Sequence, residues 1–210
     1  SLLLKKGHKL NIRDMGLLLS SGINKIRVYK KLKVAVFSTG NELVYPKKTL
    51  KQGQIYASSL FLIKELLNKF NCKCVKLKIL KDKKYLIKKE IQSLKNIDLI
   101  ITTGGVSVGK KDLVKECLTD LQMKEKFWRV KVKPGKPILF GLLDKTPFFG
   151  LPGNPVSTYV CFLLFVCEAI KKINGYNHDI IKSENAFLIS DLRNDSNREA
   201  FYRGKFYLSD

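Results

Sequence analysis

Segments with strand-like and helix-like patterns alternate three times through the middle of this 210-residue chain. The strand-like segments have continuous or alternating apolar residues, and they lie at 33 to 38 (KVAVFS), 72 to 80 (CKCVKLKIL) and 97 to 102 (IDLIIT). Each is followed by apolar residues at helical spacing, at 59 to 70, 86 to 94 and 113 to 121. Repeated strand–helix units favour parallel strands with helices packed on both faces. We therefore predict an α/β fold with a three-layer, open, mostly parallel sheet.

The two ends of the chain differ from this middle part. Shorter strands are predicted at 128 to 133, 137 to 141 and 147 to 151, and a long helix from Pro155 to about residue 173 closes the unit. We predict that residues 1 to 31 are the tail of a preceding domain and that residues 32 to 173 form the α/β domain. Residues 174 to 210, with the strand-like AFLISDL and EAFYRGKFYL, then begin a small C-terminal β-barrel domain.

The charge of the chain favours anionic ligands. It has 40 Lys and Arg against 18 Asp and Glu, a net charge of +22. Such a balance would attract phosphates, nucleic acid or an acidic membrane surface. The lysines are spread over every segment rather than gathered on one stripe, so we do not expect nucleic acid as the main partner.

Cysteines and apolar runs indicate the compartment. The five cysteines form an odd set without C-x-x-C spacing, and the only histidines, His8 and His178, are far away in sequence. This pattern supports neither a disulfide framework nor a zinc site, and a reducing cytoplasm is the expected location. The longest apolar run, at 160 to 170, is interrupted by Glu168, so we expect a buried helix there and no membrane span.

Four unusual loops follow predicted strands. They lie at 38 to 43 (STGNEL), 102 to 112 (TTGGVSVGKKD), 133 to 137 (KPGKP) and 151 to 155 (LPGNP). In an open parallel sheet, ligands bind beyond the carboxyl ends of the strands. We expect all four loops to open onto the same edge.

The glycine-rich loop at 102 to 112 has the features of a phosphate site. Gly104 and Gly105 leave backbone N–H groups accessible, and the helix that begins near Lys110 directs its positive end at the loop. The loop also contains G-V-S-V-G, which fits the nucleophile pattern of a serine hydrolase.

A hydrolase would use Ser107 with Asp144 and His178, which occur in the chain order of such a triad. However, two adjacent glycines separate the strand end from Ser107, unlike in a sharp nucleophile elbow, and His178 lies in a predicted linker. Phosphate binding is the favoured interpretation, and a serine hydrolase is the alternative.

Three carboxylates follow successive strands, Glu42, Asp82 and Asp112. If they share one edge, they can converge on one Mg²⁺ or on a water that attacks a phosphoanhydride. Capping is an alternative explanation for two of them, because aspartate is favoured at an N-cap, as for Asp82, and in a first helical turn, as for Asp112.

The last two loops combine cations with a helix start. Lys133 and Lys136 flank Pro134 and Gly135, a pair that suits the centre of a type II turn, so both ammonium groups can face one oxyanion. In LPGNP, Asn154 is a predicted N-cap followed by a proline at the first helical position, which explains both residues structurally. The helix N–H groups still open onto the same edge.

Together, STGNEL, TTGGVSVGKKD, KPGKP and LPGNPVS, in this order, closely resemble the molybdopterin molybdenumtransferase family, which includes the E domain of gephyrin. The resemblance runs from about Lys5 to the end of the chain. It implies an enzyme that inserts molybdate into the dithiolene of adenylylated molybdopterin (molybdopterin-AMP) and releases AMP, assisted by Mg²⁺. It also implies a homodimer in the full-length protein.

The resemblance assigns roles position by position. Glu42, Asp82 and Asp112 match the acidic active-site residues, with Glu42 and Asp112 as the metal ligands. Arg203 matches an arginine of the last domain that helps to hold molybdate. The other implied cofactor-binding residues lie in the four loops: Thr39, Gly40, Gly104, Gly105, Ser107, Gly109, Lys133, Lys136, Pro137, Pro152, Asn154 and Pro155.

The chain departs from the family pattern at three positions. Ala57 and Ser59 stand where the family has an acidic residue and an asparagine, so we expect lost substrate contacts there. Lys110 stands where many relatives have glutamate, which lowers the negative charge beside the metal. The family also has an earlier catalytic region, and we expect this chain to be a fragment that folds without turning over. A non-catalytic pterin-binding or scaffold module is therefore the second interpretation.

Overall fold

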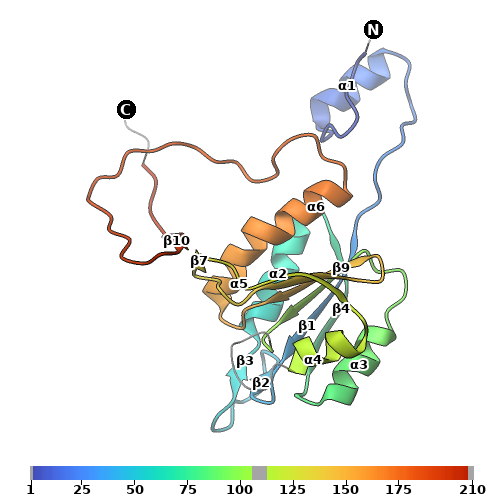
Figure 1. The fold of residues 1–210 in the computed structure, drawn as a ribbon. Coiled ribbons are helices and arrows are strands. Elements are labelled where there is room, and N and C mark those ends of the chain that lie inside the picture. Colours follow the sequence, from blue (N-terminus) through green and yellow to red (C-terminus); the bar gives the residue numbers. More distant parts are fainter. Residues whose placement is uncertain (1, 106–112, 208–210) are drawn as a thin grey trace.

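The computed structural model describes residues 2–105 and 113–207. Figure 1 shows a central α/β unit from which two end segments project in different directions. One is the N-terminal segment with α1 (Ile12–Ser20), and the other is the long segment that follows α6 (Cys167–Ile173). No helix in the described part of the chain is both long and apolar enough to cross a lipid bilayer.

The central sheet has six strands in the order β4-β1-β5-β9-β8-β6. The first four run parallel: β4 (Lys73–Leu80), β1 (Lys33–Thr39), β5 (Leu99–Thr103) and β9 (Thr146–Leu151). β8 (Leu139–Leu143) runs antiparallel to β9, and β6 (Lys124–Trp128) antiparallel to β8. The predicted mostly parallel sheet is confirmed.

Helices cover both faces of this sheet, as the three-layer prediction requires (Figure 1). One core cluster joins the sheet to α2 (Ser58–Lys69) and to one long helix made of α5 (Pro155–Cys161), the π-helical segment η1 (Phe162–Val166) and α6. The second cluster joins the other face to α3 (Lys84–Gln92) and α4 (Leu113–Asp120). Each large apolar side chain buried in these clusters contributes about 1.5–3 kcal/mol.

Strand β1 illustrates why the sequence forms a central strand. Val34 and Val36 pack into the first cluster, whereas Ala35 and Phe37 pack into the second, and all four are fully buried. A strand with helices on both faces must be apolar on both faces, so its sequence is a continuous apolar run.

The prediction of a strand over 128 to 133 is wrong. β6 ends at Trp128, and Arg129 turns the chain with a φ of 68°. After this turn, β7 (Val132–Lys133) pairs in parallel with β10 (Glu199–Ala200). The chain thus leaves the sheet earlier than its apolar pattern indicates, because the next residues pair with a distant segment.

The predicted terminal strands are also wrong in large part. Within the described residues of AFLISDL and EAFYRGKFYL, the structure forms only β10, and this segment closes no barrel. Phe187, Leu188 and Ile189 are largely exposed. A strand needs a neighbouring strand to receive its hydrogen bonds, and an apolar alternation alone does not supply one.

Candidate functional site

The carboxyl ends of the parallel strands lie side by side and define what we call the carboxyl edge. Gly104 follows β5, and its N–H donates to Leu151 O at the end of β9 (3.1 Å). Gly40 follows β1, and its N–H donates to Leu80 O at the end of β4 (3.2 Å). The loops STGNEL, TTGGVSVGKKD and LPGNP therefore begin next to one another, as the topology predicts.

The KPGKP loop reaches the same edge from a different strand. Because β8 runs antiparallel to β9, its first residue, Leu139, pairs with Gly150 near the end of β9. The residues that immediately precede β8 therefore lie at the carboxyl edge. All four loops meet there, in the part of the chain that the structure describes.

The glycine pair after β5 packs directly against the end of β1. Gly104 and Gly105 have φ values of 77° and 64°, a region that favours glycine. A Cβ on Gly104 would lie 2.7 Å from Thr39 O, and one on Gly105 would lie 2.8 Å from Thr39 Oγ1. Thr39 is buried, and its Oγ1 has no hydrogen-bond partner among the described residues. Only glycine permits this close approach, which places a polar hydroxyl against the glycine pair at the start of the predicted phosphate loop.

A reciprocal pair of hydrogen bonds fixes Asp82. The Asn41 backbone N–H donates to Asp82 Oδ2 (3.1 Å), and the Asp82 N–H donates to Asn41 Oδ1 (3.2 Å). The N-cap of α3 is Lys83, and the described residues give it no side-chain cap. The alternative that Asp82 caps this helix is therefore wrong. Its carboxylate instead ties the loop after β4 to the loop after β1.

Glu42 lies at the base of a small two-stranded arm. β2 (Leu43–Val44) pairs in parallel with β3 (Ile55–Tyr56), and the Ile55 N–H donates to Glu42 O (2.9 Å). The Glu42 carboxylate folds back over Gly40, where a Cβ would lie 2.6 Å from Glu42 Oε1. The arm and the loop after β1 thus hold this carboxylate at the carboxyl edge.

The described residues form no cluster of three acidic, histidine or cysteine side chains suited to a metal ion. Asp112, the second predicted metal ligand, lies outside the described residues, as do Ser107, Gly109 and Lys110. Mg²⁺ usually binds through one or two carboxylates together with waters and substrate phosphates. The Glu42 carboxylate fits that chemistry as one ligand, because Mg²⁺ binds oxygen atoms and needs neither histidine nor cysteine.

The LPGNP loop is held from two helices. Asn154 Oδ1 accepts from the N–H groups of Val156 (2.9 Å) and Ser157 (3.3 Å), which confirms the predicted N-cap. The Ser59 hydroxyl, on α2, donates to Gly153 O (2.7 Å). Thr158 Oγ1 lies 2.6 Å from Pro152 O and 2.9 Å from Asn154 O, so its single hydrogen is shared. Pro155 occupies the first turn of α5, where no N–H is needed.

The KPGKP loop joins β7 to β8 and contacts α5. Lys133 and Lys136 are exposed and Pro137 is half-buried, while Gly135 is buried with a φ of 124°. The Cys161 thiol donates to Gly135 O (Sγ to O, 3.4 Å). Both lysine side chains are therefore available to a ligand, while Cys161 of α5 holds the turn between them.

Arg203 lies close in sequence to a contact with this loop. The Phe201 N–H donates to Lys133 O (2.8 Å), beside the β7–β10 pairing. Arg203 is exposed and follows two residues later. The described structure thus brings the segment that carries Arg203 to the KPGKP loop.

The serine hydrolase alternative is not favoured by the described residues. Asp144 lies in the turn that joins β8 to β9, at the amino end of β9. The loop that contains Ser107 leaves β5 at the opposite, carboxyl edge. His178 follows α6, where its ring contacts Asn177 Oδ1 (3.1 Å). Ser107 itself lies outside the described residues, and the strand that precedes it ends at the edge opposite to Asp144.

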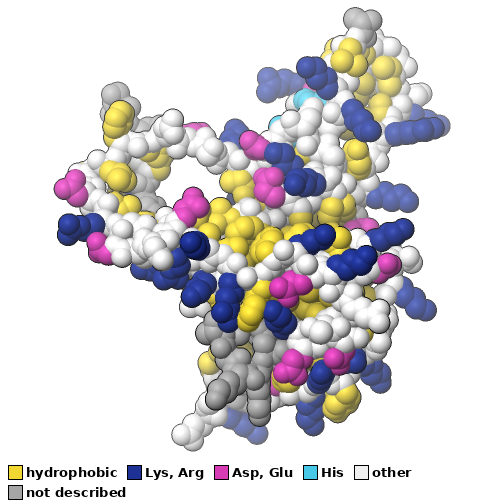
Figure 2. Space-filling view, viewed as in Figure 1, with side chains coloured by type: hydrophobic (Ala, Val, Ile, Leu, Met, Phe, Trp, Pro, Cys, Tyr) yellow, Lys and Arg dark blue, Asp and Glu magenta, His cyan; other side chains and the backbone are white. Residues whose placement is uncertain are grey.

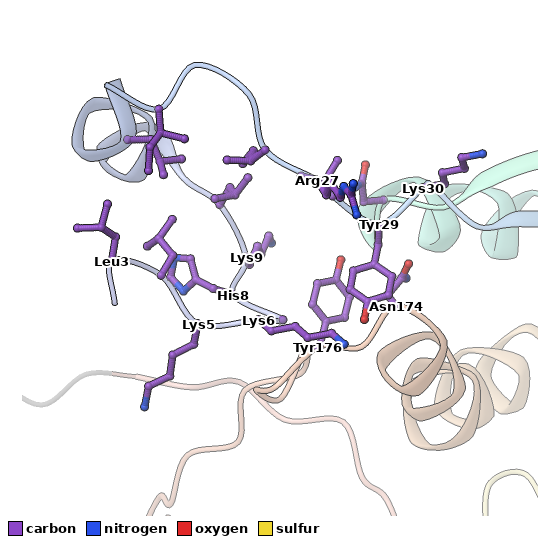
Figure 3. Close-up of a pocket in the computed structure, with 18 of the residues that line it drawn as sticks. Leu3, Lys5, Lys6, His8, Lys9, Arg27, Tyr29, Lys30, Asn174 and Tyr176 are labelled. Carbon is purple, nitrogen blue, oxygen red and sulfur yellow. The ribbon is translucent and has the colours of Figure 1, made fainter. Parts of the chain in front are cut away.

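A cavity of about 940 Å³ lies away from the carboxyl edge, between the N-terminal segment and the end of α6 (Figure 3). Basic and aromatic residues line part of it, among them Lys5, Lys6, Lys9, Arg27, Tyr29 and Tyr176. None of the described residues predicted for the site lines this cavity. Figure 2 shows Lys and Arg spread over the visible face with Asp and Glu between them, rather than on one stripe.

Sequence reasoning missed three residues that support the loops, Asn41, Thr158 and Cys161. Asn41 had a usable signal, since it is the residue before Glu42 in STGNEL. Thr158 also had one, because it lies four residues after the N-cap Asn154, in reach of that carbonyl. Cys161 had none, since its apolar surroundings explain it as core.

Known proteins resemble this chain over nearly all of its length. Residues 35–172 match the family described as "Probable molybdopterin binding domain". The molybdopterin molybdenumtransferase of Haemophilus influenzae is 39% identical over 209 residues, which cover 99% of this chain and 52% of that protein. The molybdenum cofactor synthesis protein cinnamon of Drosophila melanogaster is 40% identical over 185 residues, which cover 87% of this chain and 31% of that protein.

Solved structures agree. The molybdopterin biosynthesis moea protein from Pyrococcus horikosii superposes with a TM-score of 0.73 at 34% identity, covering 84% of this chain and 44% of that one. The chain thus spans about half the length of such relatives, or less. These matches confirm the resemblance carried by the four loop motifs.

Proposed function

The chain belongs to the molybdopterin-binding domain family, and we propose that it forms the substrate-binding core of a molybdopterin molybdenumtransferase. The proposed reaction inserts molybdate into the dithiolene of adenylylated molybdopterin and releases AMP. Two of the relatives carry a name for this activity or for molybdenum cofactor synthesis. Turnover would require the remainder of the full-length protein.

The observation that supports this proposal is the meeting of four loops at the carboxyl edge. The Gly104 N–H is held by Leu151 O, so it is Gly105, the next residue of the loop, that can present its backbone N–H to the pyrophosphate of the substrate. Lys133 and Lys136, whose side chains are exposed, can hold the molybdate oxyanion beside the dithiolene. A substrate with two separate anionic groups fits an edge with two separate sets of donors.

We also propose Mg²⁺ as the metal, with Glu42 and Asp112 as its protein ligands. When bound, Mg²⁺ polarises the phosphoanhydride and eases the departure of AMP. The hydrogen bonds between Asn41 and Asp82 support this role, since they tie the loop that carries Glu42 to the loop after β4. Arg203 would add a further cation from the C-terminal segment.

Molybdate-dependent AMP release by the full-length protein tests the proposal. Lys136→Ala and Asp112→Asn should each lower the rate by on the order of 10²–10³-fold, because each removes a charge that stabilises the reacting groups. Lys145→Ala is the matched control, since Lys145 is an exposed lysine in the β8–β9 turn at the opposite edge. Unchanged AMP release in both site variants would refute the site. Binding of molybdopterin-AMP without any release in the wild type would favour the non-catalytic module.

We further propose that the full-length protein is a cytoplasmic homodimer. In it, residues 1 to 31 would complete a preceding domain, and residues 174 to 210 would begin a C-terminal β domain. Exposed apolar side chains at both ends support the assignment of these segments to further domains, because such side chains would be buried there. They include Ile12 (90% exposed) and Ile189 (90% exposed). Light scattering of the full-length protein should give twice the mass of one chain, and a monomer would contradict the dimer.

A further inference from the structure

One helix contacts two of the four loops through two side chains. α5 follows LPGNP directly and also runs beneath KPGKP. The two contacting residues are Thr158 and Cys161, both fully buried. They are three residues apart, so they lie on one face of the helix, separated by about 4.5 Å along its axis.

Thr158 fixes the LPGNP loop. Its Oγ1 lies within hydrogen-bond distance of Pro152 O and Asn154 O, and 3.4 Å from the Ser59 hydroxyl. Ser59 in turn donates to Gly153 O. Three successive carbonyls of the loop are therefore held by two buried hydroxyl groups, so the loop cannot turn without leaving polar groups unpaired.

Cys161 fixes the KPGKP loop in a different way. Its thiol donates to Gly135 O, and a Cβ added to Gly135 would lie only 2.5 Å from Cys161 Sγ. The sulfur is therefore packed against the main chain of the glycine between the two lysines. A larger side chain at position 161 would have to push this turn outward, together with Lys133 and Lys136.

The helix that carries both residues is itself anchored. Directly after Cys161, the π-helical segment η1 buries Phe162 and Val166, and Phe162 stacks on Phe70 of the α2 end with ring centroids 6.0 Å apart. Cys167 and Ile170 of α6 are fully buried in the same cluster. α5 therefore cannot shift without disturbing the core.

We propose that Thr158 and Cys161 are positioning residues that set the spacing between the LPGNP and KPGKP loops. This inference rests on the proposed function, in which the loops at the carboxyl edge hold the pterin phosphate and the molybdate. α5 acts as a rigid spacer, so the lysines meet molybdate at the place where the dithiolene lies.

The kinetic test uses the full-length protein and makes the same cysteine-to-valine change at two buried positions. Cys161→Val should raise the KM for molybdate about ten-fold or more, because a displacement of a fraction of an ångström at a binding group weakens the contact strongly. Cys167→Val is the control, since Cys167 is an equally buried cysteine at the start of α6, in the same long helix. Thr158→Val, which removes the hydroxyl, should also raise the KM for one of the two substrates. Thr158→Ser keeps the hydroxyl and should have the wild-type KM. A purely structural defect would reduce the fraction of protein that is folded and active. It would therefore lower the apparent kcat and leave the KM unchanged.

A second readout does not need activity. The N–H groups of Val130 and Ile138 both donate to Lys136 O, so their hydrogen exchange reports on the KPGKP loop. Exchange at these amides should rise about ten-fold in Cys161→Val and remain at the wild-type rate in Cys167→Val. A wild-type protein that releases no AMP would refute the proposed function, while this exchange measurement still decides the spacing role. Equal effects of the two cysteine variants on KM and on exchange, or no rescue by Thr158→Ser, would overturn the inference.

Discussion

Gly105→Ala should lower the free energy of unfolding by more than the backbone strain of a left-handed residue alone would. Gly105 has a φ of 64°, and an added Cβ would lie 2.5 Å from Val114 Cγ2 and 2.8 Å from Thr39 Oγ1. Val114 is fully buried at the start of α4, so its branched side chain cannot move aside without disturbing the second core cluster. The substitution therefore combines backbone strain with a steric clash.

The two contributions have different sizes. A non-glycine residue in the left-handed region costs about 1–2 kcal/mol, and overpacking of a well-packed site adds about 1–3 kcal/mol. The free energy of unfolding should therefore fall by about 2–5 kcal/mol, which corresponds to a fall in Tm of about 4–20 °C for a chain of this size. Urea unfolding followed by circular dichroism measures this change.

Two further variants separate strain from clash. Gly53 has a φ of 76°, and no described atom lies within 4 Å of the position that an added Cβ would take, so Gly53→Ala should cost only the strain, about 1–2 kcal/mol. Adding Val114→Ala removes the clashing methyl group, so Gly105→Ala/Val114→Ala should be more stable than the sum of the single effects predicts. Equal losses for Gly105→Ala and Gly53→Ala, or strict additivity in the double variant, would refute the packing argument.

Three other predictions concern the core and the charged surface. Thr103→Val should cost about 1–3 kcal/mol in urea unfolding, because it leaves the buried Ser38 hydroxyl, 2.6 Å from Thr103 Oγ1, without its partner, and Ser38→Ala/Thr103→Val should recover part of the loss. Hydrogen bonds from Lys76 and then Lys78 lower the pKa of Glu90 below its usual 4.5, so its stabilisation is complete above that value and is lost as the pH falls through the folded-state pKa. Glu90→Gln should flatten stability against pH in the acidic range by about 1 kcal/mol or less, and an unchanged slope would contradict the assignment. Burial raises the pKa of Cys72 and Cys117 to about 11 and of Cys161 and Cys167 to about 12, so a disulfide reagent at about pH 8 should label these thiols only after unfolding, and rapid labelling of the folded protein would contradict their burial.

The central strands could be predicted from sequence because burial on both faces leaves few choices of residue. β1 and β5 are largely buried, with apolar residues over most of their length, and correspond closely to the predicted segments. β6 was not predicted, since it lies at the sheet edge with Lys124, Glu125 and Lys126 exposed. Its strand conformation depends on pairing with β8, which no local pattern reveals.

The short strands show the same limit more clearly. β7 and β10 have two residues each and lie far apart in sequence, yet they pair with one another. The stretch 23 to 29, INKIRVY, alternates like a strand and forms none. Alternation reports which side chains could share a face, whereas a strand also needs a partner for its backbone hydrogen bonds.

The shared edge of the site could be predicted because parallel topology determines where strand ends lie. The partners of individual side chains could not. Asp82 had an adequate local explanation as a helix cap, but its actual partner, Asn41, is 41 residues away along the chain. Cys161 had an adequate explanation as core, but it also contacts Gly135. A residue with one sufficient local explanation can have a second, tertiary role that sequence does not reveal.

The two positions expected to depart from the family pattern, Ala57 and Ser59, differ in their surroundings. Ser59 is 4% exposed and its hydroxyl donates to Gly153 O, so it supports the LPGNP loop and is not placed to bind substrate directly. Ala57 is the N-cap of α2 and, within the described residues, provides no side-chain cap. An acidic residue there would have added a negative charge at the start of α2, two residues before Ser59, and alanine does not. The absence of a negative charge at position 57 lowers the electrostatic cost of bringing an anion to the carboxyl edge. The net charge of +22 acts in the same direction. Ala57→Asp should therefore weaken binding of molybdate more at low than at high ionic strength, since salt screens the added charge, and a salt-independent effect would instead indicate a steric cause.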